Sequence, residues 1–459
     1  MTTKNDTDTI ITNSDKATAS SHTVTIDAGN DKVEVTLKDV NIDTSSRNKA
    51  AVSVTGSGNT TIKLDGDNAL KSDTSRSGIY GSGSLTISGG ENDSLTAQGG
   101  SGANGISSSG SLTISGGTVT ANGDDGGRGI SSSGRVTISG GSTVTAKGGS
   151  GTISGGDGIC SSGGVTISGG STVTANGGNG GRLVGGDGIR SSGGVTISGG
   201  STVTANGGNG GSLGGGSGIY SNGSLTISGG TVNANGGSGK NGNGGNGIIG
   251  SGRVAISGGT VNAAGGDGTN SNGGEGIYGR KGIDLSGSLE LTAKAGSPNG
   301  KALSQDGNEL DLNTIKDKLG PGAKVTVTDA NGKVNQVSIP GPVEPEESSS
   351  SSDGGSAAPS APASPLPGLT VTDKSGAVIS YTSTQSGNTL TICVGRFTAS
   401  LRASLSALRQ LRAEGIETIT FQTILCSTTL SVDELLAMGG EDAEAVLTHR
   451  LTDSSLTVG

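Results

Sequence analysis

One feature constrains this chain more than any other: it repeats itself along most of its length. The segment SSGGVTISGGSTVTANGGNGG at residues 161–181 occurs again, letter for letter, at residues 191–211. A Gly-Ile pair opens each of eight units, and the isoleucines are Ile79, Ile106, Ile130, Ile159, Ile189, Ile219, Ile248 and Ile277. They are separated by 24 to 30 residues. Units of near-constant length are typical of a solenoid, in which each unit forms one coil.

Each unit contains two four-residue motifs in which apolar and polar residues alternate. The first is VTIS or LTIS, and the second is TVTA or TVNA. In one unit Val165 and Ile167 point one way, while Thr166 and Ser168 point the other. A period of two is typical of a β-strand, whereas the helical period of 3.6 is not visible between residues 20 and 300. We therefore predict an all-β fold, a parallel β-helix with two or three short strands per coil and glycines at the corners. The constant phase argues against a disordered Gly/Ser-rich linker, which the composition alone would favour.

The composition limits both the core and the partners. The chain has 92 glycines, 1% aromatic residues and no tryptophan, so the core of the solenoid must be thin and aliphatic. Collagen is excluded, because glycine does not occupy every third position and only nine prolines are present. With 30 basic and 39 acidic side chains and no basic run, nucleic acid is not an expected partner. The three cysteines are too few for a disulfide framework, although Cys393 and Cys426 could pair.

The sequence divides into five predicted segments. They are a disordered N-terminus at 1–21, the parallel β-helix at 22–300, its C-terminal cap at 301–340, a linker rich in proline, serine and alanine at 341–367, and a small α+β domain at 368–459.

Within these segments, some elements can be placed more closely. The cap is predicted to contain one or two helical turns and a hairpin around residues 329–332. In the last segment, residues 399–415 have an amphipathic pattern that predicts a helix, and residues 416–425 read as a buried strand.

The N-terminal run VEVTLKDVNIDTSSRNKAAVSVTGSGNTTIKLDGDNAL at residues 33–70, followed by the serial LTISGG units, resembles a family of bacterial extracellular carbohydrate-binding domains. The resemblance covers about residues 22–300. It implies a right-handed parallel β-helix similar to that of pectate lyases, and a secreted or surface-attached protein that binds polysaccharide. In this family the ligands are often acidic plant glycans, and some members bind them with calcium. The α+β segment resembles a module appended to surface proteins of gut-type Firmicutes, which implies no activity.

Family members normally begin with a signal peptide, but this chain opens with no apolar stretch of that length. A truncated start would reconcile this with the expected extracellular or cell-surface location. No run of 18 apolar residues occurs, so membrane insertion is not expected.

The position two residues before each Gly-Ile isoleucine suggests a metal site. It holds Asp157 and Asp187 in consecutive units and Glu275 in the last one. Two carboxylates on adjacent coils would lie about 5 Å apart and repel each other, so a calcium ladder is one prediction, with Asp267 as a further oxygen ligand. The alternative is that these residues favour tight turns by bonding their own backbone. The calcium-binding nonapeptide itself is absent, because Cys160 or Arg190 stands at its sixth position.

Three tyrosines occupy the position directly after Gly-Ile, and we predict that they bind carbohydrate. Tyr80, Tyr220 and Tyr278 share this position with Arg190. If the isoleucine faces the core, its neighbour faces solvent on one lateral face. Sugar rings stack on tyrosine, and arginine can hold a uronate carboxylate through two hydrogen bonds. The alternative is an exposed position that tolerates any side chain.

Parts of the sequence also fit other functions. Outward Thr-x-Thr pairs resemble the ice-binding faces of antifreeze proteins, although later units change to Thr-x-Asn, as at Thr231 and Asn233. Only His22 and His449 could serve as imidazole bases, and both lie outside the repeats, so a catalytic triad is not expected. The predicted function is a secreted, non-catalytic carbohydrate-binding protein, and a polysaccharide lyase is a further alternative. The alternative is a structural adhesin whose solenoid displays the C-terminal domain to the cell wall or to another surface protein.

Overall fold

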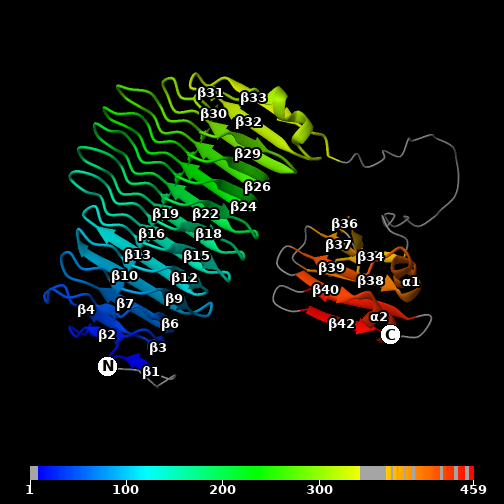
Figure 1. Ribbon diagram of the computed structural model, residues 1–459, viewed down its shortest axis with the longest axis horizontal. Coiled ribbons are helices and arrows are strands. Elements are labelled where there is room, and N and C mark those ends of the chain that lie inside the picture. The colour runs from blue at the N-terminus through cyan, green and yellow to red at the C-terminus, as the bar shows by residue number, and fades with distance from the viewer. Residues whose placement is uncertain are drawn as a thin grey trace. The chain divides into compact units, whose positions relative to one another are not determined.

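The computed structural model describes residues 9–341, 368–373, 376–379, 381–386, 388–394, 398–423, 427–438, 443–449 and 454–458. The chain divides into two compact units, residues 1–346 and 347–459. The first unit is a parallel β-solenoid, and the second contains two small sheets and two helices (Figure 1). The predicted fold class is therefore confirmed.

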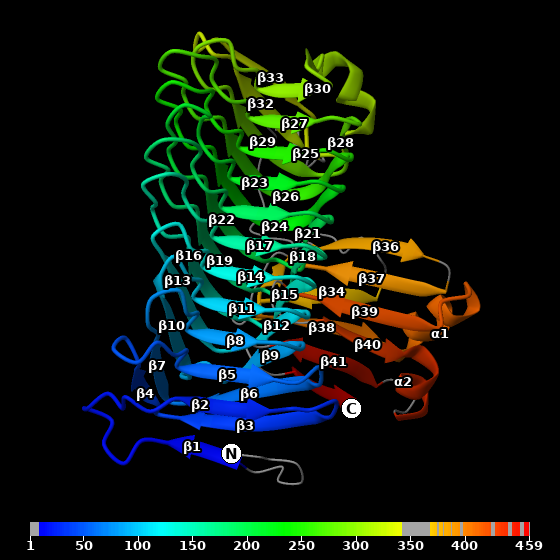
Figure 2. The same cartoon turned by 60° about the vertical axis from the view of Figure 1, so that its left-hand side comes forward.

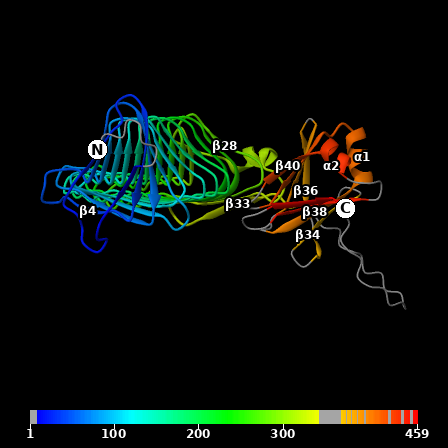
Figure 3. The ribbon, with the colours of Figure 1, turned by 90° about the horizontal axis from the view of Figure 1, so that it is seen from below.

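Each coil of the solenoid contributes three strands, and equivalent strands stack into three parallel columns (Figures 2 and 3). The first column consists of β2 (Val24–Asp27), β5 (Val52–Thr55), β8 (Ile79–Gly81), β11 (Ile106–Ser108), β14 (Ile130–Ser132), β17 (Ile159–Ser161), β20 (Ile189–Ser191), β23 (Ile219–Ser221), β25 (Ile248–Gly250), β27 (Ile277–Gly279) and β30 (Leu303–Gln305). The antiparallel strand β31 (Asn308–Glu309) ends this column.

The second and third columns join into one sheet, because two long strands run through both of them. The second column holds β3 (Lys32–Lys38), β6 (Asn59–Asp65), β9 (Leu85–Ser88), β12 (Leu112–Ser115), β15 (Arg135–Ser139), β18 (Gly164–Ile167), β21 (Val195–Ile197) and β28 (Ile283–Leu285). The third holds β4 (Asn41–Asp43), β7 (Asp67–Lys71), β10 (Ser94–Ser101), β13 (Thr118–Asp124), β16 (Thr143–Lys147), β19 (Thr172–Asn176), β22 (Thr202–Asn206), β29 (Leu289–Lys294) and β32 (Lys324–Thr328). The long strands are β24 (Leu225–Asn235) and β26 (Val254–Ala264).

The core is a set of aliphatic ladders, because the strands pair without a shift between most coils. Ile189 of β20 pairs with Ile159 below it and with Ile219 above it. Val195 and Val203 continue the equivalent ladders in the other two columns. These five side chains are at most 1% exposed. Identical residues thus stack on one another along the solenoid, as the phase of the repeat predicts.

Glycine is required where the coils turn and where they touch. At the corner between the second and third columns, Gly199 and Gly200 have φ angles of 63° and 69°, which favour glycine. The following Ser201 is buried and donates a hydrogen bond to the carbonyl of Ser198 (2.9 Å). At the start of the first column, a Cβ on Gly188 would lie 2.6 Å from the carbonyl oxygen of Gly218 on the next coil. Only glycine allows this approach.

The glycine-rich stretches between the third column and the next Gly-Ile pair form a row of loops along one edge of the solenoid (Figure 2). We call them the glycine loops; residues 177–188 form one of them. They are ordered by backbone hydrogen bonds between coils: Gly208 N–H donates to Gly186 O (2.8 Å), and Gly178 N–H donates to Gly156 O (2.8 Å). These stretches are therefore not a disordered linker, the alternative that the composition alone would favour.

The N-terminal end differs from the prediction of disorder over residues 1–21. Strand β1 (Thr9–Thr12) pairs in parallel with β3, and Ile11 packs against the core of the first coil. The physical reason is that the lower edge of β3 would otherwise leave its backbone groups without partners, and the β-branched run TIIT is well suited to fill that edge. The disorder prediction is thus wrong from Thr9 onward, and residues 1–8 lie outside the described residues.

At the C-terminal end, the last coil is covered by a short helix and a hairpin. The 3-10 helix η1 (Leu312–Lys318) buries Leu312 and Ile315 against the core. Strand β33 (Val334–Ser338) folds back antiparallel on β32, with Asp329 N–H donating to Lys333 O in the turn. Both elements occur where the sequence places them.

The second unit contains a five-stranded and a four-stranded sheet. The first has the order β35 (Val378–Ile379), β34 (Leu369–Thr372), β38 (Ala399–Ser404), β41 (Glu444–His449) and β42 (Ser454–Val458). The second has the order β36 (Thr382–Ser386), β37 (Thr389–Cys393), β39 (Thr418–Gln422) and β40 (Ser427–Ser431). The helices are α1 (Leu405–Ala413) and α2 (Val432–Met438). The helix predicted at 399–415 is wrong over 399–404, where β38 buries Ala399, Leu401 and Ala403 on one face with a strand period.

Candidate functional site

The outward residues of the first column form a single file along the solenoid. Each strand has the form Ile-x-Ser or a close variant, in which the first and third residues face the core and the middle one faces outward. We call the file of middle residues the outer column. In order, it consists of Ser53, Tyr80, Ser107, Ser131, Cys160, Arg190, Tyr220, Ile249 and Tyr278. This placement agrees with the inward isoleucine assumed from the sequence.

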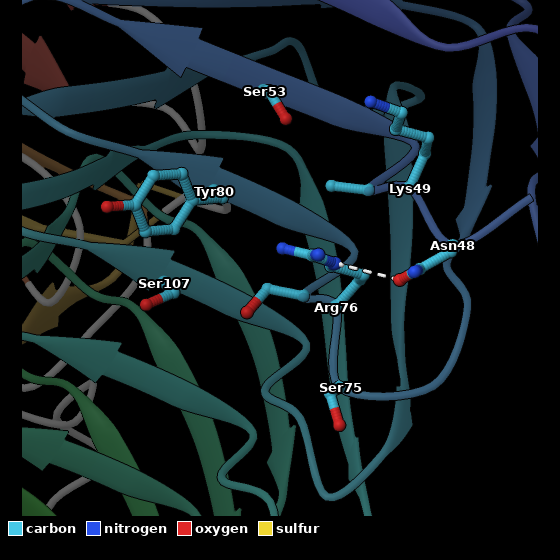
Figure 4. Close-up of a pocket in the computed structure, with 9 residues that line it drawn as sticks. Asn48, Lys49, Ser53, Ser75, Arg76, Tyr80 and Ser107 are labelled. Atoms are coloured by element: carbon cyan, nitrogen blue, oxygen red, sulfur yellow. Dashed lines mark hydrogen bonds between the residues drawn. The ribbon is translucent and has the colours of Figure 1, made fainter.

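Tyr80 lines a pocket of about 430 Å³, which we call the Tyr80 pocket. Its other lining residues are Asn48, Lys49, Ala50, Ser53, Ser75, Arg76, Ser77 and Ser107. Figure 4 shows the tyrosine ring on one side and Arg76 with Asn48 on the other. Tyr80 is 43% exposed, and no acidic side chain lines the pocket. An aromatic ring, two cations and four serines on nearby strands and turns thus surround one space.

Two irregular turns bring the cations of the Tyr80 pocket together. Asn48 and Ser75 both have positive φ angles, 50° and 59°. The carboxylate of Asp73 joins these turns by accepting hydrogen bonds from the backbone N–H groups of Asn48 and Thr74 (2.6 Å for Thr74), and these bonds lower its pKa. Arg76 Nε donates to Asn48 Oδ1 (3.4 Å). Within the described part of the chain, neither cation of the pocket forms an ion pair, so both charges are available to a ligand.

A second group of large side chains lies four coils further along the outer column. Arg190 Nη1 donates to Asp187 Oδ2 (2.7 Å), and its guanidinium carbon lies 4.7 Å from the centre of the Tyr220 ring. Ile249 and Tyr278 continue the file on the next two coils. The predicted binding residues therefore lie on one face of the solenoid, but they form two separate clusters on it. Tyr80 belongs to the first, and Arg190, Tyr220 and Tyr278 belong to the second.

Asp157 and Asp187 lie on adjacent coils, as predicted, but their oxygens already have partners. Asp157 Oδ1 accepts from the backbone N–H of Asp187 (2.9 Å), and Asp187 Oδ1 accepts from that of Ser217 (2.6 Å). The second oxygen of each carboxylate pairs with an arginine, Arg128 for Asp157 (3.2 Å) and Arg190 for Asp187. Burial and the neighbouring carboxylate raise the pKa of Asp187 to about 6. An arginine beside each carboxylate thus offsets the charge repulsion.

The other two predicted calcium ligands also lie apart. Asp267 is exposed in a glycine loop, where its Oδ1 accepts from the backbone N–H of Ser297 (2.8 Å). The backbone N–H of Glu275 donates to Asn246 Oδ1 on the coil below (2.8 Å). Among the described residues, no group of three or more His, Cys, Asp or Glu side chains could hold a metal ion. The side-chain oxygens of Asp157, Asp187 and Asp267 bond the neighbouring coil, and the four residues do not come together as a group of ligands. Whether calcium binds stays a prediction.

The same kind of bond recurs along the glycine loops, which was not expected from the sequence. Asn179 Oδ1 accepts from the backbone N–H of Asn209 (2.8 Å), and Asn209 Oδ1 accepts from that of Ser238 (2.8 Å). Beside the third column, the side-chain amide of Asn206 donates to Asn176 Oδ1 (2.8 Å). At these positions the side chains thus bond the neighbouring coil rather than their own turn. The recurrence of Asn and Asp at one position per unit is the signal that could have indicated these ladders.

The remaining nucleophilic and imidazole groups lie outside the outer column, with one exception. Cys160 belongs to the column, and burial raises its pKa to about 11. His22 lies next to Ser20 near the first coil, with Nδ1 3.2 Å from the serine hydroxyl. His449 is buried in the second unit beside Phe421, and burial lowers its pKa. Cys393 is a free thiol, and its suggested partner Cys426 lies outside the described residues.

A comparison with protein families agrees with the stacked coils. A family model described as a beta helix repeat matches residues 112–134 and 225–248. The first unit is a β-helix. Neither the curated proteins nor the solved structures contain a match to this chain. In the β-helix and in the described part of the second unit, no helix is long and apolar enough to cross a membrane.

Proposed function

We propose that the outer column of the β-helix binds a polysaccharide that carries carboxylate groups. The observation that carries this proposal is the Tyr80 pocket, where an exposed aromatic ring lies beside Lys49 and Arg76. Neither cation is paired with an acidic side chain in the described part of the chain. The chain as a whole has a net charge of −9, so a cluster of two unpaired cations is a local exception that favours an anionic ligand.

The chemistry of the pocket fits a uronate sugar. One face of a pyranose ring presents C–H groups, which pack against a tyrosine ring while the sugar hydroxyls face the serines. Arginine can hold a carboxylate through two parallel hydrogen bonds, and lysine adds a second positive charge. Arg190 and Tyr220 offer a second arginine beside a tyrosine on the same face. Repetition of a weak site along one polymer raises the overall affinity without any new kind of contact.

Titration of the full-length protein with oligogalacturonate, followed by calorimetry, tests the proposal. Tyr80→Ala should lower the affinity about three- to tenfold, the size of one stacking contact. Lys49→Gln combined with Arg76→Gln should weaken binding further and reduce its sensitivity to salt. Arg135→Gln is the matched control, because Arg135 is exposed at the start of β15 in the second column, where its Nη1 donates to Thr166. Equal binding of a neutral glucan, or an unchanged affinity in Tyr80→Ala, would refute the proposal.

We further propose that binding leaves the polymer intact and takes place outside the cell. The residues that line the Tyr80 pocket include no carboxylate and no imidazole to remove a proton from the sugar. A lyase would release unsaturated products that absorb in the ultraviolet. Absorbance that grows during incubation with polygalacturonate would contradict the non-catalytic role, and binding without growth would support it.

A further inference from the structure

A row of exposed aliphatic side chains crosses the glycine loops of three consecutive coils. Four of the eight large hydrophobic side chains that are exposed in the described part of the chain lie here: Ile153, Leu183, Val184 and Leu213. Backbone hydrogen bonds stack them, because Leu183 N–H donates to Ile153 O (2.8 Å) and Leu213 N–H donates to Leu183 O (3.1 Å). We call this row the loop ridge. Single exposed aliphatic residues are ordinary, but a cluster of them on adjacent coils is typical of a contact surface.

A groove of about 530 Å³ runs beside the loop ridge. Its floor is formed by residues 150–152, 179–181 and 209–211, which come just before the ridge residues in each loop. These residues are glycine, serine, threonine or asparagine. Because no large side chain fills this floor, the groove has room for an aliphatic ridge that belongs to another molecule.

The two ends of the groove carry opposite charges. Asp125, in the loop after β13, lines one end, and Lys240, in the loop after β24, lines the other. Both side chains are exposed, and neither forms an ion pair with another residue that the structure describes. The pairing of β13 through β16, β19 and β22 to β24 makes these the first and last of five consecutive loops, with the loop of Leu183 in the middle.

We propose that the loop ridge and its groove form an interface between two copies of the β-helix, which lie antiparallel about a two-fold axis at the level of Leu183. Such an axis exchanges the loop of Ile153 with that of Leu213, so each ridge is covered by the other molecule. It also brings Asp125 of each copy to Lys240 of the partner subunit. A parallel arrangement would place like charges together at both ends, so the charges select the antiparallel direction.

The size of this surface indicates a weak dimer. Five loops span about 19 Å along the stack. A patch of this length is smaller than the surface that stable dimers bury, so the association should be reversible and depend on concentration. No residue of the outer column belongs to the patch, and this inference therefore does not depend on the proposed function. The dimer would carry two outer columns.

Sedimentation equilibrium of the full-length protein over a concentration series measures the association. Wild type should shift from one chain to two as its concentration rises. Leu213→Ser should raise the dissociation constant at least about tenfold, because each dimer loses two buried leucines. Val334→Ser is the matched control, since Val334 is 59% exposed on β33 of the C-terminal hairpin. A molar mass of one chain at every concentration up to about 1 mM, or an equal effect of the two substitutions, would overturn the proposal.

The position of the axis makes a separate prediction about Arg182. This residue lies in the middle loop, so its two copies come close to each other and repel. The equivalent residue on the next coil is Ser212, whose backbone N–H donates to Arg182 O (2.8 Å). Arg182→Ser should therefore strengthen the dimer about two- to fivefold, the size of one exposed charge interaction. A dissociation constant that does not fall would contradict an axis at this level.

Exchange of the two end charges tests the antiparallel direction. Asp125→Lys and Lys240→Asp each place like charges at both ends of the interface, so each variant alone should dimerise about tenfold more weakly than wild type. An equimolar mixture of the two variants should associate again, because every end contact then joins a lysine to an aspartate. Thermal unfolding followed by circular dichroism checks that each variant is folded; if one is not, Leu213→Ser decides the proposal. A mixture that associates no better than the separate variants would overturn the antiparallel dimer.

Discussion

The two oxygens of the buried Asp187 carboxylate have different hydrogen-bond partners. One oxygen accepts the backbone N–H of Ser217 on the next coil, and the other holds Arg190. Burial is the main reason that its pKa is raised to about 6, above the ordinary value of 3.8. The folded protein therefore binds this proton more tightly than the unfolded chain does. As the pH rises from about 4 to about 6, this residue alone makes the free energy of unfolding smaller, and above that range its effect is constant.

Asp187→Asn keeps an oxygen for Ser217 and removes the titration. We expect the variant to gain stability relative to wild type at pH 7.5 but not at pH 4.5, as measured by urea unfolding at both pH values. Asp267→Asn serves as the control, because Asp267 accepts the equivalent bond from Ser297 in an exposed loop. A difference between Asp187→Asn and wild type that does not change with pH would contradict the expected role of the buried charge.

The sequence predicts part of the candidate site at the scale of residues. The period of two places Tyr80, Arg190, Tyr220 and Tyr278 on one outward file, and the structure shows them there. Whether they bind carbohydrate stays a prediction. Lys49 and Arg76 were missed, because irregular turns with positive φ angles bring them to Tyr80 and such turns have no periodic signal. The partners of Asp157 and Asp187 could not be predicted either. The sequence alone does not determine whether a carboxylate oxygen binds a cation, a backbone N–H of its own turn or a backbone N–H of the next coil.

At the scale of elements, the glycine loops are the unusual part of this fold. They pack backbone against backbone, which no residue with a side chain permits. A Cβ on Gly208 would lie 2.0 Å from the carbonyl oxygen of Gly178, and that oxygen belongs to a hydrogen-bonded backbone that cannot move aside alone.

Gly208→Ala should therefore destabilise the β-helix by at least about 3 kcal/mol, at the upper end of the cost of overpacking. Thermal unfolding followed by circular dichroism measures the effect. Gly81→Ala is the matched control, because the nearest atom to a Cβ there is 3.7 Å away and the equivalent residue on the next coil, Ser108, already carries a side chain. If the two variants unfold at the same temperature, the close packing of the glycine loops is not essential.

The elements also show where the sequence is ambiguous. In the β-helix a single phase recurs in eight units, so each unit supports the same assignment. The second unit has no repeat, and residues 399–404 satisfy both a strand and a helix period until Leu405 begins α1. There the pairing of β38 with β34 and β41, which lie far away in sequence, decides the outcome.

At the scale of the whole molecule, the β-helix is a stack in which each coil contacts mainly its neighbours. Deletion of residues 107–130 joins Ile106 to Ser131, which are adjacent in the repeat, and Ser131 takes the place of Ser107 beside the Tyr80 pocket. We expect this variant to fold and to show a strand spectrum by circular dichroism, since solenoid stability is approximately a sum over coils. Deletion of residues 107–118 is the control, because it joins a first-column strand to a third-column one and should prevent folding. Equal behaviour of the two deletions would show that register does not govern this fold.

The hydrogen bonds between coils run along the axis of the stack, and this direction has a mechanical consequence. Strand β1 lies in the first coil and β32 in the last, so tension applied between the two ends of the β-helix acts along these bonds and loads them one coil after another. The stack would therefore peel rather than shear, yielding at low force in many small events. Each coil of 29 residues would release up to about 100 Å of chain. A β-helix that is bound to a polymer along its side and pulled at one end would thus dissipate the applied force by unfolding one coil at a time.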